Sequence, residues 1–483
     1  MSYALISSEA TTITNREHLH EKEFLFSLKP SRRPIARKRK ASNGHSRAKK
    51  EFRKDYPIIV HCHLCWDWVW QRPQQFISRL SQRHKILFVE TVAPAPDLAR
   101  PLARYRTAQN FPNVTILTLQ FPTWRWSNGK YVDGERRRIV QEFIAGPGAG
   151  QFENPVQWFY DPMAVPAFAG QMSEALTVYD CMDELSKFRC APPEIVQREA
   201  ELLKRADVVF TGGRKLFEAK SEHNDNCHFY GCGVDCEHFG KALAAETAVP
   251  EDLAAILSSV AAPPLAARAA LPIRRKPILG YFGVVDERMD YELITRLADA
   301  NREWSVVMIG PTTKVDESVL PKRPNLHWLG QRSYMDLPAY CKGFDVCLMP
   351  FALNESTEFI NPTKALEYMA TGRMIVSTAV PDVVRNFGAV IKIAKEHDEF
   401  IRLCREAVEK PEPDAIKRGS RMACENTWER IVARMEEHIE EAFKMKRTGR
   451  SAGGTMNRRE RLDSSLRGEA RVNGVSQTKR VIA

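Results

Sequence analysis

The chain has 483 residues, 43% of them hydrophobic, and is therefore long enough to bury two cores of ordinary size. The formal net charge is +11, but residues 1–55 carry 14 Lys and Arg against 6 Asp and Glu, and residues 444–483 carry 11 against 3. The region between them is mildly acidic, so its composition gives no sign of a nucleic-acid-binding body.

The two basic ends are poor in large apolar residues, which predicts disordered extensions at 1–55 and 444–483. Their basic runs are not interleaved with aromatic residues, and this disfavours nucleic acid as a partner. An anionic membrane surface is the expected partner, because Lys and Arg are attracted to anionic lipid. A merely solubilising extension is the alternative.

Eleven cysteines at irregular spacing, without a signal peptide before them, favour a reducing cytoplasm over a disulfide framework. No apolar run is long enough to span a bilayer, so we expect a cytoplasmic protein that contacts the inner face of the plasma membrane through its basic ends. The pairs in "HCHLC" (61–65) and "CGVDC" (232–236) could bind zinc. The first pair also fits a buried strand, in which Cys behaves as a small hydrophobe.

From residue 56 onwards, short apolar runs alternate with helical patterns, which predicts an α/β fold with parallel sheets. One β-α-β unit reads "PIIVHCHL", "PQQFISRLSQR" and "KILFVE", and Pro73 suits the first turn of its helix. Further strands are predicted at "VTILTLQF", "VQWFYD", "ALTVYD" and "ADVVFTG". The pattern stops near residue 240, so we assign 56–240 to an N-terminal domain and the Ala/Pro-rich 241–275 to a linker.

A second series of strands begins at residue 276 with "PILGYF" and continues through "WSVVMIGP", "NLHWLG", "FDVCLMPF", "MIVSTAV" and "AVIKIA". Ligands of such sheets bind beyond the carboxyl ends of the strands, so a nucleotide site is expected there. The last predicted element is a helix in "TWERIVARMEEHIEEAFKMK", whose apolar residues fall on one face. The second domain is assigned to 276–443, with this terminal helix included.

The stretch "NPTKALEYMATG" (361–372) is predicted to be a helix, with Asn361 as the N-cap and Pro362 as the first helical residue. Thr363, Lys364 and Glu367 share the side opposite the apolar face. Free amides and an ammonium group favour an anion such as phosphate, and a carboxylate one turn further on suits ribose hydroxyls. An ordinary Lys/Glu surface pair is the alternative.

Several segments of the sequence resemble the GT-B glycosyltransferases, in particular the bacterial branch that builds cell-surface polysaccharides. The resemblance rests on "FDVCLMPF", "NPTKALEYMATGRMIVST", "GVDCEHF", "ILGYFGVVDERMD" and "WDWVWQRPQQFISRLSQRHKILFVE", and it covers residues 56 to 443. It implies two Rossmann-like domains facing each other across a cleft, with the donor in the C-terminal domain and the acceptor in the N-terminal one.

Carried over residue by residue, the resemblance implies that Lys364 meets the donor diphosphate and Glu367 the ribose, with Thr363 beside them. Gly283 would allow the backbone to approach the phosphates closely. The retaining relatives have a second Glu eight residues before the helix Glu, and here Phe359 stands at that position. The resemblance therefore leaves the contact to the donor sugar, and the stereochemistry, open.

Two further donor residues are expected at strand ends of the second domain. Arg288 in "DERMD" is a candidate second phosphate contact, with a solvated charged loop as the alternative. Gly310 in "MIGP" is expected to face the base or ribose, although it is also an ordinary turn signal.

In the first domain, "YDCMDE" places carboxylates just after a predicted strand. An inverting transferase needs a general base, and we expect Asp183 in that role, with Asp180 as the second choice. Capping of the following helical segment by Asp is the alternative. The loop "CWDWVWQR" predicts an acceptor site at Trp66, Asp67 and Arg72, because indole faces stack on sugars and charged groups bind hydroxyls. Core packing is the competing role for the tryptophans.

The sequence thus predicts a transferase that moves a sugar from a nucleoside-diphosphate donor, UDP-linked, to a glycan or lipid-linked acceptor. No cofactor or metal is expected, because the lysine and the helix amides supply positive charge at the diphosphate. The alternatives are a nucleotide-sugar epimerase of the same fold and a non-catalytic scaffold that binds a glycan or nucleotide at the membrane surface.

Overall fold

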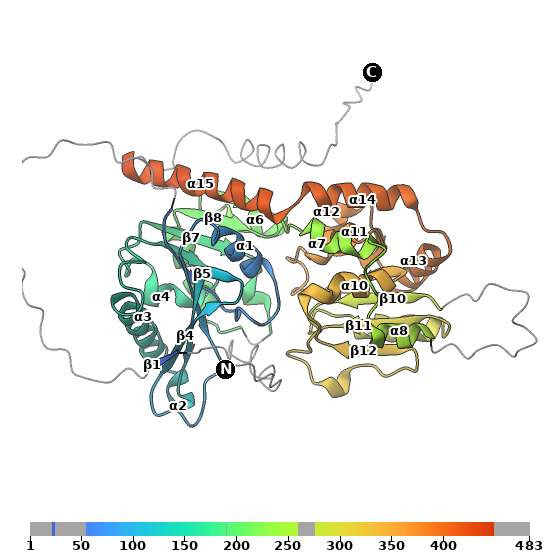
Figure 1. Cartoon of the computed structure of the whole chain (residues 1–483), viewed down its shortest axis with the longest axis horizontal. Coiled ribbons are helices and arrows are strands. Elements are labelled where there is room, and N and C mark those ends of the chain that lie inside the picture. The colour runs from blue at the N-terminus through green and yellow to red at the C-terminus, as the bar shows by residue number, and fades with distance from the viewer. Residues whose placement is uncertain (1–21, 25–54, 190, 259–275, 449–483) are drawn as a thin grey trace, which may run out of the picture.

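A computed structural model describes residues 22–24, 55–189, 191–258 and 276–448. The predicted disordered tail 444–483 lies mostly outside these residues, as does most of the extension 1–55. Within that extension, Lys22–Phe24 form the short strand β1 at the edge of the first sheet. The two sheets lie in two lobes side by side, with long helices running along one edge of both (Figure 1).

The first sheet has nine strands in the order β1-β4-β5-β3-β2-β6-β7-β8-β9, and all neighbours from β5 to β9 are parallel. The strands of this sheet are β2 Ile58–His61, β3 Ile86–Thr91, β4 Leu102–Ala108, β5 Phe111–Gln120, β6 Val156–Phe159, β7 Leu176–Cys181, β8 Val208–Thr211 and β9 Cys227–Phe229, besides β1. The antiparallel hairpin β4–β5 extends the expected parallel sheet at one edge.

Helices cover both faces of this sheet, as the alternating pattern predicts. They are α1 Arg72–Leu80, α2 Thr123–Trp126, α3 Gly129–Ala145, α4 Val165–Phe168, α5 Ile195–Arg205 and α6 Arg214–Lys220. Pro73 lies in the first turn of α1, as predicted.

The second sheet has six parallel strands in the order β12-β11-β10-β13-β14-β15. They are β10 Ile278–Phe282, β11 Ser305–Ile309, β12 Leu326–Gly330, β13 Val346–Met349, β14 Met374–Thr378 and β15 Lys392–Ala394. Its helices are α7 Cys236–Gly240, α8 Glu251–Ser258, α9 Tyr291–Ala300, α10 Leu337–Gly343, α11 Lys364–Ala370, α12 Pro381–Phe387, α13 His397–Glu409 and α14 Pro413–Glu425. The α/β fold with two parallel-sheet domains is therefore confirmed.

Part of the segment predicted as a linker belongs to the second domain. Leu253 of α8 is fully buried in the core of that domain, and Asp252 pairs with Arg332 at 2.8 Å. Residues 259–275, the remainder of the predicted linker, lie outside the described residues.

The terminal helix α15 (Trp428–Thr448) follows α14 in sequence but packs on the first domain (Figure 1). Its apolar side joins one core cluster of that domain through Trp428, Val432, Met435, Ile439 and Ala442. The helix pattern was predicted correctly, but the sequence placed the helix with the wrong domain, because an apolar face does not reveal its partner.

The chain thus crosses between the domains twice, and the two crossings lie side by side. Val234 of the first crossing donates its backbone N–H to the carbonyl of Asn426 in the second at 2.9 Å. A Cβ added to Gly233 would lie 2.8 Å from the Trp428 ring, so only glycine fits at this contact.

A disulfide between Cys236 and Cys424 joins the same two crossings, with their Cα atoms 5.4 Å apart. The expectation of reduced cysteines is wrong for this pair. The two residues are separated by 188 positions in the sequence, so their spacing along the chain could not reveal that the fold brings them together.

Candidate active site

A cavity of about 900 Å³ lies between the carboxyl ends of the two sheets. The second domain contributes Gly283, Lys364 and Glu367 to its lining, and the first domain contributes the loop 66–72 and Asp183. The structure therefore brings the candidate donor and acceptor residues to one cavity, as expected for a ligand site at the strand ends of parallel sheets.

The start of α11 differs from the prediction. The helix begins at Lys364, its N-cap is Thr363, and no side chain caps it. Asn361, predicted as the cap, instead donates its Nδ2 to the carbonyl of Gly212 in the first domain at 3.1 Å. The prediction was wrong because this distant partner competes with the local capping role. The Thr363 hydroxyl donates to the Sγ of Cys232 at 3.3 Å.

The side chains of Lys364 and Glu367 line the cavity, and neither forms a hydrogen bond or an ion pair with a residue in the described ranges. Glu367 is only 6% exposed, and burial raises its pKa while the neighbouring ammonium of Lys364 opposes that rise. Burial lowers the pKa of Lys364, and Glu367 opposes it. Two charges held in a concave site without partners indicate a ligand that carries both an anion and hydrogen-bond donors.

Two glycines form the wall beside Lys364. Gly283 has φ +140° and Gly310 has φ +146°, a region that other residues rarely adopt. A Cβ at Gly283 would lie 2.0 Å from the Cε of Lys364, and one at Gly310 would lie 1.8 Å from the carbonyl oxygen of Gly283. The missing side chains therefore leave room for the lysine and for a ligand against the backbone.

Arg288 follows β10 and lines the same half of the cavity. Its guanidinium donates to both carboxylate oxygens of Asp286, at 3.0 Å and 2.6 Å. This pairing holds the pKa of Asp286 below its usual value despite burial. Arg288 is therefore fixed in place, but part of its charge is already neutralised.

Asp183 follows β7 and reaches the cavity from the first domain. Burial raises its pKa to about 6, although the cations Arg288 and Lys314 oppose the rise. The next residue, Glu184, pairs with Lys220 at 2.6 Å, which anchors the loop. The following 3₁₀ turn, Leu185–Lys187, has no side-chain cap, so helix capping is not the role of Asp183.

Asp180, the second candidate base, does not line the cavity. It lies at the end of β7, is fully buried and forms an ion pair with Arg72 at 2.8 Å. It was predicted to face the cleft because it ends a strand, but Arg72, 108 residues away, holds it inside the domain.

The three predicted acceptor residues all have protein partners. Trp66 is 3% exposed and packs edge-on against Phe88 at 5.2 Å, so it belongs mainly to the core. Asp67 forms an ion pair with Arg106 of β4. Arg72, besides its pair with Asp180, donates to the carbonyl of Tyr230 at 2.8 Å. All three nevertheless line the cavity, so their contact with an acceptor stays a prediction.

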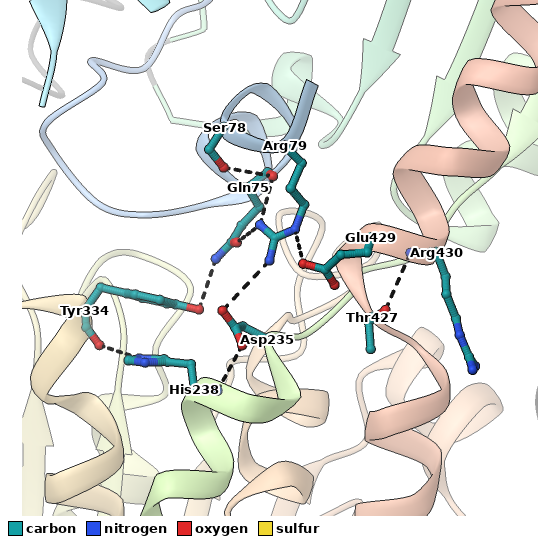
Figure 2. Close-up of polar contacts among 9 residues, drawn as sticks. All are labelled: Gln75, Ser78, Arg79, Asp235, His238, Tyr334, Thr427, Glu429 and Arg430. Atoms are coloured by element: carbon teal, nitrogen blue, oxygen red, sulfur yellow. Dashed lines mark hydrogen bonds and ion pairs between the residues drawn. The ribbon is translucent and has the colours of Figure 1, made fainter. Parts of the chain in front are cut away.

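Sequence reasoning missed the residues that join α1 to the second domain. Gln75 donates to the hydroxyl of Tyr334 at 3.0 Å, and the Tyr334 carbonyl lies 3.0 Å from the Nε2 of His238 (Figure 2). Gln75 and Tyr334 lie 259 positions apart in the sequence, so local pattern could not reveal that they meet.

Comparison with known proteins is consistent with this geometry. Residues 276–410 match the family model described as Glycosyl transferases group 1. The chain is a glycosyltransferase whose second domain matches this group. The Bacillus subtilis (strain 168) protein TuaH, assigned as a teichuronic acid biosynthesis glycosyltransferase, is 23% identical over 303 residues, which are 58% of this chain and 70% of TuaH.

The solved structures with a similar fold are GT-B glycosyltransferases. The Escherichia coli trehalose-6-phosphate enzyme bound with UDP-2-fluoro glucose superposes with a TM-score of 0.55 at 12% identity, over 80% of this chain and 98% of that one. Sucrose-phosphate synthase from Thermosynechococcus elongatus gives 0.58 at 14% identity, over 81% and 100%. At these identities the likeness establishes the GT-B fold alone.

In this glycosyltransferase, Phe359 stands where retaining relatives have a second carboxylate. Its ring packs against a core cluster of the first domain, and the Nζ of Lys215 lies 5.7 Å from the ring centroid. The neighbouring Glu355 and Glu358 form ion pairs with Lys187 and Lys215. None of these residues lines the cavity.

The zinc hypothesis for the cysteine pairs has no support in the described residues, which hold no cluster of three or more potential metal ligands. Cys62 is buried directly after β2, as the strand alternative predicted, and Cys236 is in the disulfide. Among the helices described, none is both long and apolar enough to cross a bilayer.

Proposed function

We propose that this enzyme transfers a sugar from a nucleoside-diphosphate donor, UDP-linked, to a glycan or lipid-linked acceptor in surface polysaccharide biosynthesis. The observation that carries the proposal is the unpaired Lys364 ammonium, enclosed by Gly283 and set beside Glu367 in the cavity. The structural neighbours add support, because two of them are described as bound with UDP-2-fluoro glucose and as UDP-forming. The name of TuaH favours a polysaccharide product.

In the proposed mechanism, Lys364 binds the donor diphosphate and stabilises the charge that develops on it as the bond to the sugar breaks. Arg288, on the same side, adds a second cation, so these side chains supply positive charge at the leaving group without a metal. Glu367 accepts hydrogen bonds from the ribose hydroxyls, while Gly283 and Gly310 let the nucleotide lie against the backbone.

Asp183 is the proposed general base. The acceptor oxygen forms a bond to the anomeric carbon, the bond from that carbon to the diphosphate oxygen breaks, and the acceptor proton passes to Asp183. The role suits a carboxylate whose pKa burial raises to about 6, because such a group is ionised near neutral pH and is still a useful proton acceptor.

The test is isothermal titration of UDP into the wild-type enzyme and Lys364→Ala. Loss of a charged hydrogen bond should weaken binding by about 1.5 to 3 kcal/mol. Lys417→Ala is the matched control, since Lys417 is exposed on α14 and outside the cavity. Equal UDP affinity in wild type and Lys364→Ala would contradict the donor site.

Turnover is tested by incubating the wild type with a panel of UDP-sugars and measuring UDP release. Slow release by hydrolysis supports transfer. Binding without release toward any acceptor would favour the non-catalytic alternative, and interconversion of the sugar without release would favour an epimerase.

A further inference from the structure

The first domain presents two cations to the cavity, Arg72 and Arg79, and both already form ion pairs within the chain. Arg72 is held by the buried Asp180. Arg79 donates to Glu429 of α15 at 2.6 Å, and its other end lies 3.9 Å from Asp235, so it is enclosed by acidic groups of the two crossings (Figure 2). Each cation is already paired with a carboxylate, so less of its charge is available to an anionic group of a substrate.

The remaining polar side chains of this half of the cavity are mostly neutral carboxamides. They are Gln71, Gln75, Gln82, Gln109 and Asn110. The side chains of Gln109 and Asn110 at the β4–β5 turn are exposed and have no hydrogen-bond partner in the described part of the chain. A carboxamide both donates and accepts, which matches the hydroxyls of a sugar.

Indole rings supply the apolar side of the same surface. Trp68 and Trp70 are partly exposed and line the cavity. Trp70 stacks on Phe111, with centroids 5.8 Å apart and an interplanar angle of 28°, and lies 6.2 Å from Tyr334 of the second domain. A rigid aromatic wall of this kind suits the C–H face of a sugar ring.

One cation of the lining departs from this pattern. Lys241, in the turn after α7, is exposed and has no ion pair within the described residues. Glu237, also in the lining, lies four positions earlier in the chain, so a negative charge accompanies it. Lys241 is therefore the residue through which an anionic acceptor could still bind.

We propose that the acceptor group bound in this half of the cavity is an uncharged sugar, which stacks on Trp70 and is hydrogen-bonded by Gln109 and neighbouring carboxamides. This inference rests on the proposed transferase function and specifies its acceptor. It distinguishes the enzyme from a structural neighbour of Burkholderia xenovorans, which is described in complex with glucose-6-phosphate. A phosphorylated acceptor needs an available cation, and here the first domain has paired its own.

The test uses the full chain saturated with UDP and titrates matched pairs of probes by calorimetry. The probes are the methyl glycosides of glucose, mannose and N-acetylglucosamine, the 6-phosphates of the same three sugars, and glucuronate. At least one methyl glycoside should bind, and the corresponding 6-phosphate should bind about ten-fold more weakly, because its charge would be desolvated without a partner.

Variants locate the binding surface. Trp70→Ala should weaken binding of the methyl glycoside by about ten-fold, and Gln109→Ala by about three-fold. Gln109 is exposed, so its variant remains informative if Trp70→Ala is poorly folded. Trp124→Ala is the control, since Trp124 is 61% exposed on α2 and away from the cavity.

Two results would overturn the proposal. One is that a sugar phosphate or glucuronate binds more tightly than the methyl glycosides and that this binding is lost in Lys241→Ala. The other is that no methyl glycoside binds to the UDP-loaded enzyme. Failure of the proposed transferase function would be recognised earlier in the same experiment, because UDP itself would not bind before any sugar is added.

Discussion

The loops that follow β2 and β10 occupy equivalent places in the two domains and are built in opposite ways. Each strand is the first of its domain in the parallel series and has parallel neighbours on both sides. After β10 the chain continues with Gly283, which has no side chain and leaves space beside the Lys364 ammonium. The loop after β2 instead carries Trp66, Trp68 and Trp70, whose rings line the cavity.

Under the proposed function, one topological position would serve two kinds of ligand, depending on what the loop leaves open. Glycine exposes the backbone and would let the Lys364 ammonium meet a phosphate, as proposed. Indoles remove that space and present an apolar wall, while the nearby cations are neutralised internally. Substitutions in one of the two loops should therefore affect one ligand and leave the other unaffected.

The largest effect is expected from Asp183→Asn, which removes the proposed base. Asp183 belongs to the first domain, as does the tryptophan loop (residues 66–70). Transfer should fall by about 10² to 10⁴-fold, the usual contribution of a general base, while UDP affinity stays unchanged. Acceptor-dependent UDP release and calorimetry measure the two quantities. Asp414→Asn, at an exposed position of α14, is the control. Full activity of Asp183→Asn would remove the residue from the mechanism.

Gly283→Ala changes only the loop that follows β10. Its Cβ would collide with Lys364, and φ +140° strains any other residue, so UDP binding should weaken by about 1 to 3 kcal/mol. Gly134→Ala is the matched control, because no atom lies within 4 Å of its added Cβ in α3. That control should raise the free energy of unfolding by about 0.5 to 1 kcal/mol and leave UDP affinity alone. Unchanged UDP affinity in Gly283→Ala would show that the loop does not approach the nucleotide.

The pH dependence of transfer is expected to reflect Asp183. Only the ionised carboxylate accepts a proton, and burial raises its pKa to about 6, so kcat/KM should be constant above this pH. Below it, kcat/KM should fall about ten-fold per pH unit, since the fraction of ionised carboxylate falls by that factor. The residual activity of Asp183→Asn should not fall at acid pH in this way. If the acid fall remains in this variant, the titration belongs to another group.

The smallest effect is expected from Asp67→Asn in the tryptophan loop. Its ion pair with Arg106 is solvent-exposed, and such pairs contribute at most about 1 kcal/mol. Chemical denaturation should therefore show a loss of stability below this value, with UDP affinity unchanged. A larger loss would mean that the pair, and not the packing of Trp66, fixes the loop.

The sequence predicted the features that depend on local pattern. Apolar runs ending in turn residues gave the parallel strands, and Pro73 indicated the start of α1. The placement of Lys364 and Glu367 on one side of a helix beyond a strand also follows from local spacing, and the structure brings both to the cavity.

What could not be predicted depends on partners distant in sequence. Asn361 is a good cap by local rules, but it bonds to Gly212 in the other domain. Asp180 lies near the end of β7, three positions before Asp183, yet only the fold reveals that Arg72 binds it in the interior. The antiparallel β4–β5 hairpin was missed for a different reason, since its strand β4 lacks a continuous apolar run.

The crossing of α15 onto the first domain has a consequence for synthesis. Trp428 and the apolar residues that follow it complete a core whose other members lie between residues 56 and 230. The ribosome therefore delivers the last part of the first domain after the entire second domain. Domains made in order of sequence usually fold as units while the chain emerges, but here the first domain must wait, partly assembled, until the C-terminal helix is released.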